Sequence, residues 1–342
     1  MKSKELLTQS YDFTLPQELI ATHPASPRDS AKLLVYNRAD NSITHTYFYE
    51  FENFLPKDVA LVFNNTKVIK ARLYGKKSSG GKIELLINRP LDASKVHVYI
   101  RGRVKLEQEI FFNQDLKVVV VELLEDGTRI VEFYKNGIRL RFEDVLPILD
   151  AIGHVPLPPY IAREDNSEDE SEYQSVFAQK EGAVAAPTAS LHFTQEQHQR
   201  IMQNFKTAYV TLHVGSGTFK PVESEVITEH PMHSEYYEIP QETKELLDST
   251  TPILSVGTTS TRTIEYYVRH KEQLSGEANL FLHPQNKPQR VNHLLTNFHL
   301  PKSTLLMLVA SFVGLEKTLE LYEEAIAKEY RFYSYGDAML IL

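Results

Sequence analysis

Residues 68–104 read VIKARLYGKKSSGGKIELLINRPLDASKVHVYIRGRV, a series of short β-type segments separated by turn residues. The pattern continues in DLKVVVVELLEDG (115–127) and TRIVEFYKNG (128–137). Five or more short strands with tight connections are typical of a small antiparallel barrel. We therefore predict a β-barrel domain over residues 64–147.

The residues on both sides of this segment follow a different pattern. Apolar runs at 59–66, 208–215 and 252–259 predict buried strands. Apolar spacings of three and four predict helices at 193–205, 243–249, 261–273, 302–314 and 315–330. The expected fold is α/β, with a larger, discontinuous α/β catalytic domain (1–63 and 148–342) interrupted by the inserted small antiparallel β-barrel.

Composition limits the class of protein. The chain has 342 residues, of which 42% are hydrophobic, and this is enough for about two domains. It contains no cysteine, which excludes disulfides, thiolate metal sites and cysteine nucleophiles. No apolar run reaches the roughly 20 residues that span a bilayer, and the N-terminus lacks the apolar stretch of a secretory signal. We expect a cytoplasmic protein with no membrane partner.

Charge is distributed unevenly along the chain. The net charge is -8, yet residues 66–105 hold 11 basic and 2 acidic residues, a surplus of +9. A basic segment of this kind is typical of a surface that binds a polyanion, although it also suits a lysine-rich barrel surface that prevents aggregation. The candidate nucleic-acid contacts are Lys67, Lys70, Arg72, Lys76, Lys77, Lys82, Arg101 and Arg103. If the strand continues through Gly102, Arg101 and Arg103 share one face. The acidic run at 164–172 predicts a solvated, mobile loop.

Three segments place short polar residues at a predicted strand end or helix start. In the first, Gly257, Thr258, Thr259 and Ser260 follow the strand ILSV, and a helix is expected to begin near Thr261, with Arg262 beside its start. Free N–H groups at a helix start attract a carboxylate or phosphate, although the same residues also suit an ordinary helix cap.

The other two segments are TLHVGSGTF (211–219) and TNFHLPKST (296–304). The first offers His213, Gly215, Gly217 and Thr218 near a possible ligand, but it lacks a dinucleotide fingerprint and also suits a glycine hairpin or bulge. The second offers Asn297, His299, Ser303 and Thr304 at a helix start, where His299 could instead be a hydrogen-bonded core histidine.

Metal and hydrolase sites are poorly supported. His230, His233 and Glu235 in HPMHSE are zinc-type ligands, but in an extended segment residues three apart point to opposite faces. No HExxH or GxSxG motif is present. We therefore expect no metal and no serine nucleophile.

Taken together, six motifs closely resemble the S-adenosylmethionine:tRNA ribosyltransferase-isomerase family. They are GAVAAPTASLHFT (182–194), VTLHVGSGTFKPV (210–222), HPMHSEYYEIP (230–240), VGTTSTRTIE (256–265), LLTNFHLPKSTLLMLVASFVG (294–314) and YRFYSYGDAMLIL (330–342). The N-terminal segments YDFTLPQELIATHPASPRDSAKLLV and VFNNTKVIKARLYGKK resemble that family too, so the similarity covers nearly the whole chain. Ser190 and the stretch HPQNKPQR (283–290) depart from its pattern.

The resemblance implies a transferase of queuosine biosynthesis. It would move the ribosyl part of S-adenosylmethionine, consumed as a co-substrate, to 7-aminomethyl-7-deazaguanine in the anticodon of tRNA, giving epoxyqueuosine-tRNA, adenine and methionine. Within the matched motifs, His299 and His192 are acid/base candidates, and Glu235 is a candidate base or cation-binding carboxylate. The candidate substrate-binding residues are His213, Gly215, Gly217, Thr218, His233, Thr258, Thr259, Ser260, Arg262, Asn297, Ser303 and Thr304.

Two other classes stay open at this point. A nonenzymatic RNA-binding adaptor would use the basic barrel but would leave the polar motifs without a task. An S-adenosylmethionine-dependent RNA methyltransferase would use the same co-substrate.

Overall fold

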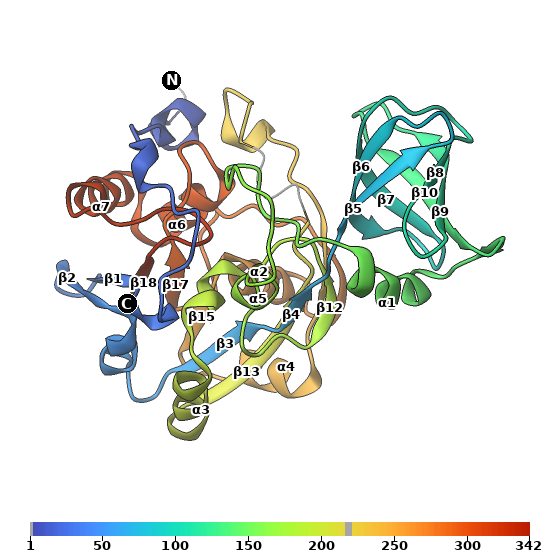
Figure 1. Ribbon diagram of the computed structural model, residues 1–342. Coiled ribbons are helices and arrows are strands. Elements are labelled where there is room, and N and C mark those ends of the chain that lie inside the picture. Colours follow the sequence, from blue (N-terminus) through green and yellow to red (C-terminus); the bar gives the residue numbers. More distant parts are fainter. Residues whose placement is uncertain (1–2, 216–220) are drawn as a thin grey trace.

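Six strands close into an antiparallel barrel in the computed structural model of the chain, which describes residues 3–215 and 221–342 (Figure 1). The order is β10-β7-β6-β5-β8-β9, and β9 pairs back with β10. The strands are β5 (Arg72–Lys77), β6 (Lys82–Pro90), β7 (Lys95–Arg101), β8 (Glu109–Phe111), β9 (Leu116–Leu123) and β10 (Arg129–Lys135), with β11 (Ile138–Arg139) attached to β10. The predicted barrel is confirmed.

Alternation of side chains explains why these residues form a barrel. On β6, Ile83, Leu85 and Ile87 are buried in the barrel core, while the residues between them are partly exposed. Closure leaves few strand edges open to aggregation. One expectation is wrong: β7 ends at Arg101, and Gly102 has φ of 127°, so Arg103 lies beyond the strand and the two arginines do not share a strand face.

The described part of the larger lobe is built on a nine-stranded mixed sheet, in the order β16-β14-β13-β3-β15-β17-β18-β1-β2. Its central strands β13, β3, β15 and β17 are parallel neighbours. The strands are β1 (Lys32–Asn37), β2 (Ser42–Tyr47), β3 (Ala60–Asn64), β13 (Lys206–Leu212), β14 (Glu235–Glu238), β15 (Ile253–Val256), β16 (Ser275–Ala278), β17 (His293–Asn297) and β18 (Ala338–Ile341).

Helices cover this sheet, and each of the five predicted helices is present. They are α3 (Gln195–Asn204), α4 (Gln241–Asp248), α5 (Thr258–Arg269), α6 (Thr304–Val313) and α7 (Leu315–Ala327). On α5, Ile264 and Tyr267 pack with Val210 and Leu212 of β13 in one apolar cluster, which fixes α5 against the sheet. The 3₁₀ helices are η1 (Lys4–Leu6), η2 (Thr8–Tyr11), η3 (Gln17–Leu19), η4 (Arg28–Ser30), η5 (Phe48–Phe54), η6 (Thr188–His192) and η8 (Ile227–Glu229).

Two short strands pair beside the barrel. β4 (Thr66–Val68) leads into the barrel and pairs in parallel with β12 (Lys180–Ala183), which follows the segment 153–179. Helix α1 (Phe142–Ile152) packs Val145, Ile148 and Leu149 onto the barrel core and continues through residue 147. The domain boundaries therefore stay a prediction.

The acidic run at 164–172 is more ordered than expected. It contains helix α2 (Asp169–Glu172), and Asp169 is buried. Both Asp169 oxygens accept hydrogen bonds from the Arg163 guanidinium at 2.7 Å, and Tyr335 Oη donates to Oδ1 at 3.1 Å. The expectation of a solvated loop is wrong at this residue because a buried carboxylate with two donors is stable where an unpaired one is not.

Candidate active site

A cavity lies where the parallel strands of the large sheet end. Strands β3, β13, β15 and β17 run in the same direction, so their carboxyl ends share one edge of the sheet. Such an edge is the usual ligand site in α/β folds. The segments after β15 and β17 line a cavity of about 790 Å³, including its open mouth.

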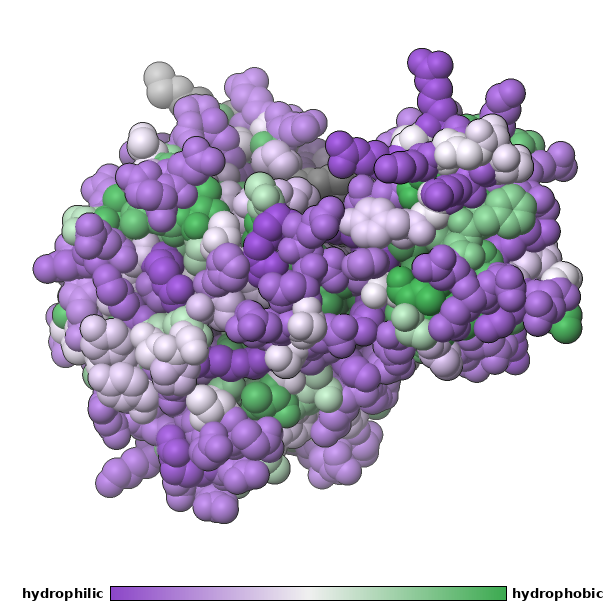
Figure 2. Space-filling model, in the orientation of Figure 1, coloured by the Kyte–Doolittle hydropathy of each residue, from purple (hydrophilic) through white to green (hydrophobic). Residues whose placement is uncertain are grey.

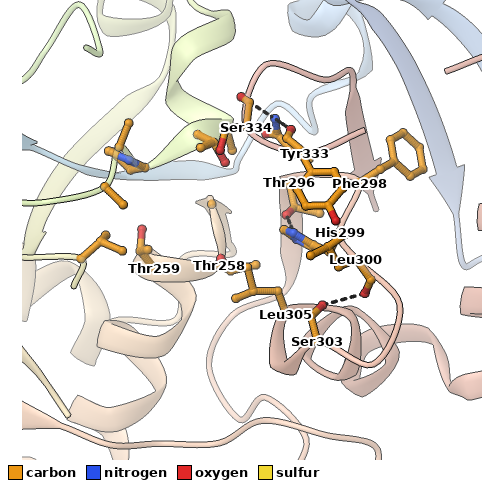
Figure 3. A pocket seen from close by; sticks show the side chains of 18 of the residues that line it. Thr258, Thr259, Thr296, Phe298, His299, Leu300, Ser303, Leu305, Tyr333 and Ser334 are labelled. Atoms are coloured by element: carbon orange, nitrogen blue, oxygen red, sulfur yellow. Dashed lines mark hydrogen bonds between the residues drawn. The ribbon is translucent and has the colours of Figure 1, made fainter. Parts of the chain in front are cut away.

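The start of α5 forms one side of the cavity. Gly257 has φ of 93°, a left-handed conformation that glycine adopts without strain, and it turns the chain from β15 into α5. Thr258 and Thr259 then face the cavity (Figure 3). Among the described residues, the N–H groups of Thr258, Thr259 and Ser260 have no hydrogen-bond acceptor. The positive end of the helix is therefore available to an anion.

The start of α6 forms a second side. Ser303 caps this helix: its Oγ accepts from Leu306 N–H at 3.2 Å and donates to the Leu300 carbonyl at 2.8 Å. Figure 3 shows Ser303 and Leu305 on the opposite side of the cavity from Tyr333 and Ser334. Two helix N-termini, α5 and α6, thus meet at one cavity.

His299 lines this cavity, on the loop that leads from β17 into α6. Its Nε2 is 2.8 Å from Thr296 Oγ1, and its backbone N–H donates to Tyr322 Oη at 3.0 Å. Burial lowers the pKa of His299 to about 3, so the ring is neutral at physiological pH. The described residues supply no hydrogen-bond partner for Nδ1, which leaves that atom for a ligand.

Asn297 also reaches the cavity wall, but it is used to fix the backbone. Its Nδ2 donates to the carbonyls of Tyr333 and Ser334, at 3.0 and 3.2 Å. Thr304, the first residue of α6, is buried and does not line the cavity. Ser260 does not line it either, because its Oγ donates to the Val256 carbonyl at 2.9 Å inside the fold. Neither of these two residues is placed to hold a ligand through its side chain.

The other residues of the cavity wall were not predicted from the sequence. Tyr160, Tyr333, Ser334 and the stretch 185–189 complete it. Tyr333 and Ser334 lie in the quoted C-terminal motif, but their small polar and aromatic types carry no local signal for a ligand site. No Asp, Glu, Lys or Arg occurs among the described lining residues.

His192, predicted to act in proton transfer, does not reach the cavity. It is buried, and its ring packs against Phe48 with centroids 4.9 Å apart. Burial lowers its pKa to about 4. His192 is thus not among the described residues that line the cavity, and its role in proton transfer stays a prediction.

Glu235, predicted as a base or a cation-binding carboxylate, lies in an ion pair. It is buried against Arg262, whose Nη1 donates to Oε2, while Gly215 N–H donates to Oε1 at 2.9 Å. Burial by itself raises the pKa of Glu235, but Arg262, His233 and the Gly215 amide outweigh it and hold that pKa at about 2. Glu235 is not among the described residues that line the cavity, whereas His299 is. The pair occupies Nη1 of Arg262, whereas its buried Nε has no hydrogen-bond partner among the described residues, so its role in substrate binding stays a prediction.

A second, larger cleft lies between the lobes. Its volume is about 2430 Å³, including space open to solvent, and it is lined by residues of both lobes, including Arg89, His213, Gly215 and His233. The ring of His213 is held by Thr66, with Nδ1 2.8 Å from Thr66 Oγ1. The cleft and the cavity meet at 214–215 and Pro221. The predicted ligand residues Gly217 and Thr218 lie outside the described residues.

The predicted basic contacts divide into two groups. Lys67, Lys70 and Arg72 are paired with Glu181, Glu170 and Glu84 respectively, so three of the counted charges are neutralised within the chain. The others gather around the β5–β6 turn and the end of β7, and we call them the barrel-tip cluster: Lys76, Lys77, Lys82, Arg101 and Arg103. Within this cluster, Arg101 Nη1 lies 3.7 Å from Glu84 Oε2.

Like charges face each other within the barrel-tip cluster. Lys76 lies directly across from Lys82 in the β5–β6 pair, and Lys77 Nζ donates to the Arg103 carbonyl at 3.0 Å. Cross-strand pairs of like charge destabilise a sheet. Their presence favours an anionic partner over a purely structural role. The barrel stands as a separate lobe, and most of the face in view is hydrophilic (Figure 2).

Neither a metal-binding cluster nor a membrane-spanning helix is found in the described part of the chain. No group of three or more His, Asp or Glu residues there could hold a metal ion. Within residues 3–215 and 221–342, no helix has the length and apolar character to cross a membrane.

Comparisons with known proteins agree with the resemblance seen in the sequence. The family model described as queuosine biosynthesis protein matches residues 8–341. The chain is 71% identical over 342 residues to an S-adenosylmethionine:tRNA ribosyltransferase-isomerase of Sulfurimonas denitrificans, covering 100% of both chains. It is 62% identical over 337 residues to that of Nitratiruptor sp., covering 98% of this chain and 99% of the relative. A crystal structure of an S-adenosylmethionine tRNA ribosyltransferase from Thermotoga maritima is 35% identical, with a TM-score of 0.54, and covers 97% of this chain and 100% of that one.

The buried Glu235–Arg262 pair predicts a large loss of stability on Glu235→Gln. Removing one buried charge leaves the other uncompensated, at a cost of about 3–5 kcal/mol. Glu238→Gln on the same strand is the control, because its partner Lys180 and Glu238 itself are more than a third exposed, and it should cost less than about 1 kcal/mol. Urea denaturation measures both.

The same pair predicts a pH dependence. Since the folded pKa of Glu235 is lowered, its contribution to stability is complete above the pKa of an unfolded glutamate, about 4.3, and is lost as pH falls from there toward 2. The difference in stability between wild type and Glu235→Gln should shrink across that range. Equal destabilisation by the two glutamine variants would contradict the pairing.

Proposed function

Because this chain belongs to the queuosine biosynthesis protein family, we propose that it is an S-adenosylmethionine:tRNA ribosyltransferase-isomerase acting on 7-aminomethyl-7-deazaguanine in the anticodon. The observation that carries the proposal is the full-length similarity, together with a cavity formed by the matched motifs at the start of α5 and α6. The products are epoxyqueuosine-tRNA, adenine and methionine.

The cavity holds S-adenosylmethionine in this proposal. The free N–H groups of Thr258 and Thr259, at the positive end of α5, bind the methionine carboxylate in place of Arg262. The small residues at 185–189 leave room for a flat ring system. The modified base enters from the cleft between the lobes, since cleft and cavity meet at 214–215.

The chemistry begins at the sulfonium. This group acidifies the protons on the neighbouring ribose C5′, so that a base can remove one. The electron pair forms a C4′=C5′ bond, the C4′–O4′ bond breaks, O4′ becomes a carbonyl oxygen on C1′, and adenine leaves with the electron pair of its glycosidic bond. The amine of the deazaguanine adds to C4′ and loses a proton, C5′ attacks the C1′ carbonyl, and the resulting alkoxide displaces methionine from C5′ to close the epoxide. His299 is the proton-transfer candidate that lines the cavity, through its free Nδ1.

The barrel-tip cluster binds tRNA phosphates in this proposal. Strand β6 places Lys82 six residues from Asn88 at the cleft, or about 20 Å along an extended strand. Contacts at that distance reach the tRNA backbone beyond the target nucleotide. They supply affinity and orientation, whereas the larger lobe supplies the chemistry.

The first test is the product set. The purified protein should release adenine from S-adenosylmethionine only when tRNA carrying the aminomethyl-deazaguanine is present, and chromatography detects it. Mass spectrometry of the tRNA should show a ribosyl-sized increment. S-adenosylhomocysteine with a methyl increment would show a methyltransferase instead, and an unchanged tRNA would favour the adaptor.

The role of His299 is tested by His299→Ala, which should lower turnover by roughly 100-fold or more with little change in thermal stability. Because burial keeps the pKa of His299 near 3, its own titration should not appear in the activity profile between pH 5 and 8. His293→Ala is the control, since His293 also has a lowered pKa, of about 4, but lies at the other end of β17. Parallel loss of stability and turnover in His299→Ala would make His299 a core histidine.

If the barrel-tip cluster binds tRNA, the affinity for tRNA should depend less on salt when the cluster is replaced. Replacing Lys76, Lys77, Arg101 and Arg103 with Ala should raise the tRNA dissociation constant and flatten the plot of log affinity against log salt, by about 0.7–0.9 for each lost phosphate contact. Replacing four exposed lysines of the larger lobe, Lys206, Lys271, Lys287 and Lys328, makes the same charge change and should flatten it less. Equal slopes for the two variants would move the RNA path off the barrel.

A further inference from the structure

The cavity assigned above to S-adenosylmethionine must accept a cationic sulfonium without a carboxylate to balance it. Its described lining residues include no charged side chain, and Glu235 is already paired with Arg262 outside the cavity. The ends of α5 and α6 present positive dipoles, which attract the methionine carboxylate but repel a cation. Another feature of the wall must therefore favour the sulfonium.

Two tyrosine rings stand together in this wall. The centroids of Tyr160 and Tyr333 are 4.1 Å apart, with their planes tilted by 45°. Figure 3 shows the Tyr333 ring extending across the cavity above His299, whereas the Phe298 ring points away. Tyr160 is held by Ser334: its hydroxyl contacts Ser334 Oγ and accepts from Ser334 N–H at 3.1 Å.

The backbone of Tyr333 is held in an uncommon conformation. Its φ is 74°, in the left-handed region that bulky residues rarely adopt. Asn297 donates to its carbonyl at 3.0 Å, Gly336 N–H donates to the same oxygen at 3.0 Å, and Tyr333 N–H donates to the Phe298 carbonyl at 3.0 Å. Three bonds thus stabilise a conformation that glycine would adopt more easily. A tyrosine at this position indicates that the ring itself has a task.

Both phenols stay neutral. Burial raises the pKa of Tyr333 to about 12 and raises the pKa of Tyr160 further. The rings therefore attract a cation through the negative face of the aromatic system, and this attraction is strongest where water is excluded.

We propose that Tyr160 and Tyr333 form an aromatic wall that selects the sulfonium of S-adenosylmethionine over the neutral thioether of S-adenosylhomocysteine, with Asn297 as the positioning residue for Tyr333. This inference rests on the proposed function, because it assigns a subsite within the same cavity. It gives the cavity two distinct ends: helix N-termini for the carboxylate, and aromatic faces for the sulfonium. Discrimination against the thioether matters because it lacks the charge that makes the C5′ protons acidic.

The test compares two ligands that differ by one methyl group and one charge. Calorimetric titration measures the binding of S-adenosylmethionine and S-adenosylhomocysteine, both to the enzyme alone and to the enzyme saturated with tRNA that carries unmodified guanine and cannot react. Tyr333→Gly is the informative variant, since glycine accepts φ of 74° without strain and the backbone can stay in place. It should weaken S-adenosylmethionine binding by roughly 3- to 30-fold, as expected for loss of a cation–π contact, and S-adenosylhomocysteine binding by less than about twofold.

Two further variants keep the result interpretable. Tyr333→Phe retains the ring, so it should keep the wild-type preference between the two ligands. Tyr160→Leu keeps an apolar side chain but removes the aromatic face, so it should lower the preference as Tyr333→Gly does. Thermal denaturation of each variant checks that the fold is retained.

The outcomes separate this inference from the proposed function. Equal weakening of both ligands in Tyr333→Gly would show that the ring is only an apolar wall and would overturn the inference while leaving the cavity assignment intact. Unchanged binding of both ligands would overturn it as well. Failure of the wild-type enzyme to bind either ligand, with or without tRNA, would overturn the proposed function and this inference together.

Discussion

The side chain of Asn64 joins the parts of the molecule on which the site depends. It is fully buried at the end of β3 and makes four hydrogen bonds: Oδ1 accepts from the N–H groups of Thr66 and Leu212, both at 3.1 Å, and Nδ2 donates to the Leu212 carbonyl at 3.0 Å and to Thr259 Oγ1 at 3.1 Å. One amide therefore fixes the end of β13, the start of α5 and the segment that leads into the barrel. A buried amide with all of these groups satisfied is rigid and specific, and an unsatisfied one is costly.

Charge is handled differently in the two lobes. In the larger lobe the strongly charged groups near the site are paired internally, as Glu235 is with Arg262, and the cavity is lined by neutral groups and helix ends. At the barrel tip, by contrast, cations are exposed and face one another. A neutral, water-poor cavity strengthens weak electrostatic contacts, whereas an exposed cluster of cations acts on a polyanion over a distance limited by salt. The separation suits an enzyme that binds a large polyanion in one place and reacts with a small co-substrate in another.

Position in the fold distinguishes two histidines that both lie in matched sequence motifs. His192 and His299 both lie in motifs of the family, and burial lowers the pKa of both. Only His299 follows a strand that ends at the cavity edge, so only its ring borders the space where a ligand fits. Neutral histidines are common in protein interiors, and their position decides their function more than their pKa does.

The sequence by itself determined the features that depend on neighbours along the chain. Apolar alternation at 68–137 predicted the barrel strands, and apolar spacings of three and four predicted helices such as α5 and α6. Turn and capping residues predicted one helix start near Thr261 and another near Ser303. In the structure α5 begins three residues earlier, at Thr258, and both helix starts lie at one cavity. These features follow from local backbone preference and periodicity, which can be seen in a single segment.

Only the tertiary structure decided which polar groups are free. Arg262 is paired with Glu235, 27 residues away, and Lys67 and Lys70 are paired with acids 114 and 100 residues away. The contact between the rings of Tyr160 and Tyr333 also joins segments that are distant in the chain. Pairing and burial depend on which strands and loops become neighbours in space, and the energy of an ionic or aromatic group is set by those neighbours. No local sequence pattern predicts these pairings, because they form only when the sheet and the barrel are assembled.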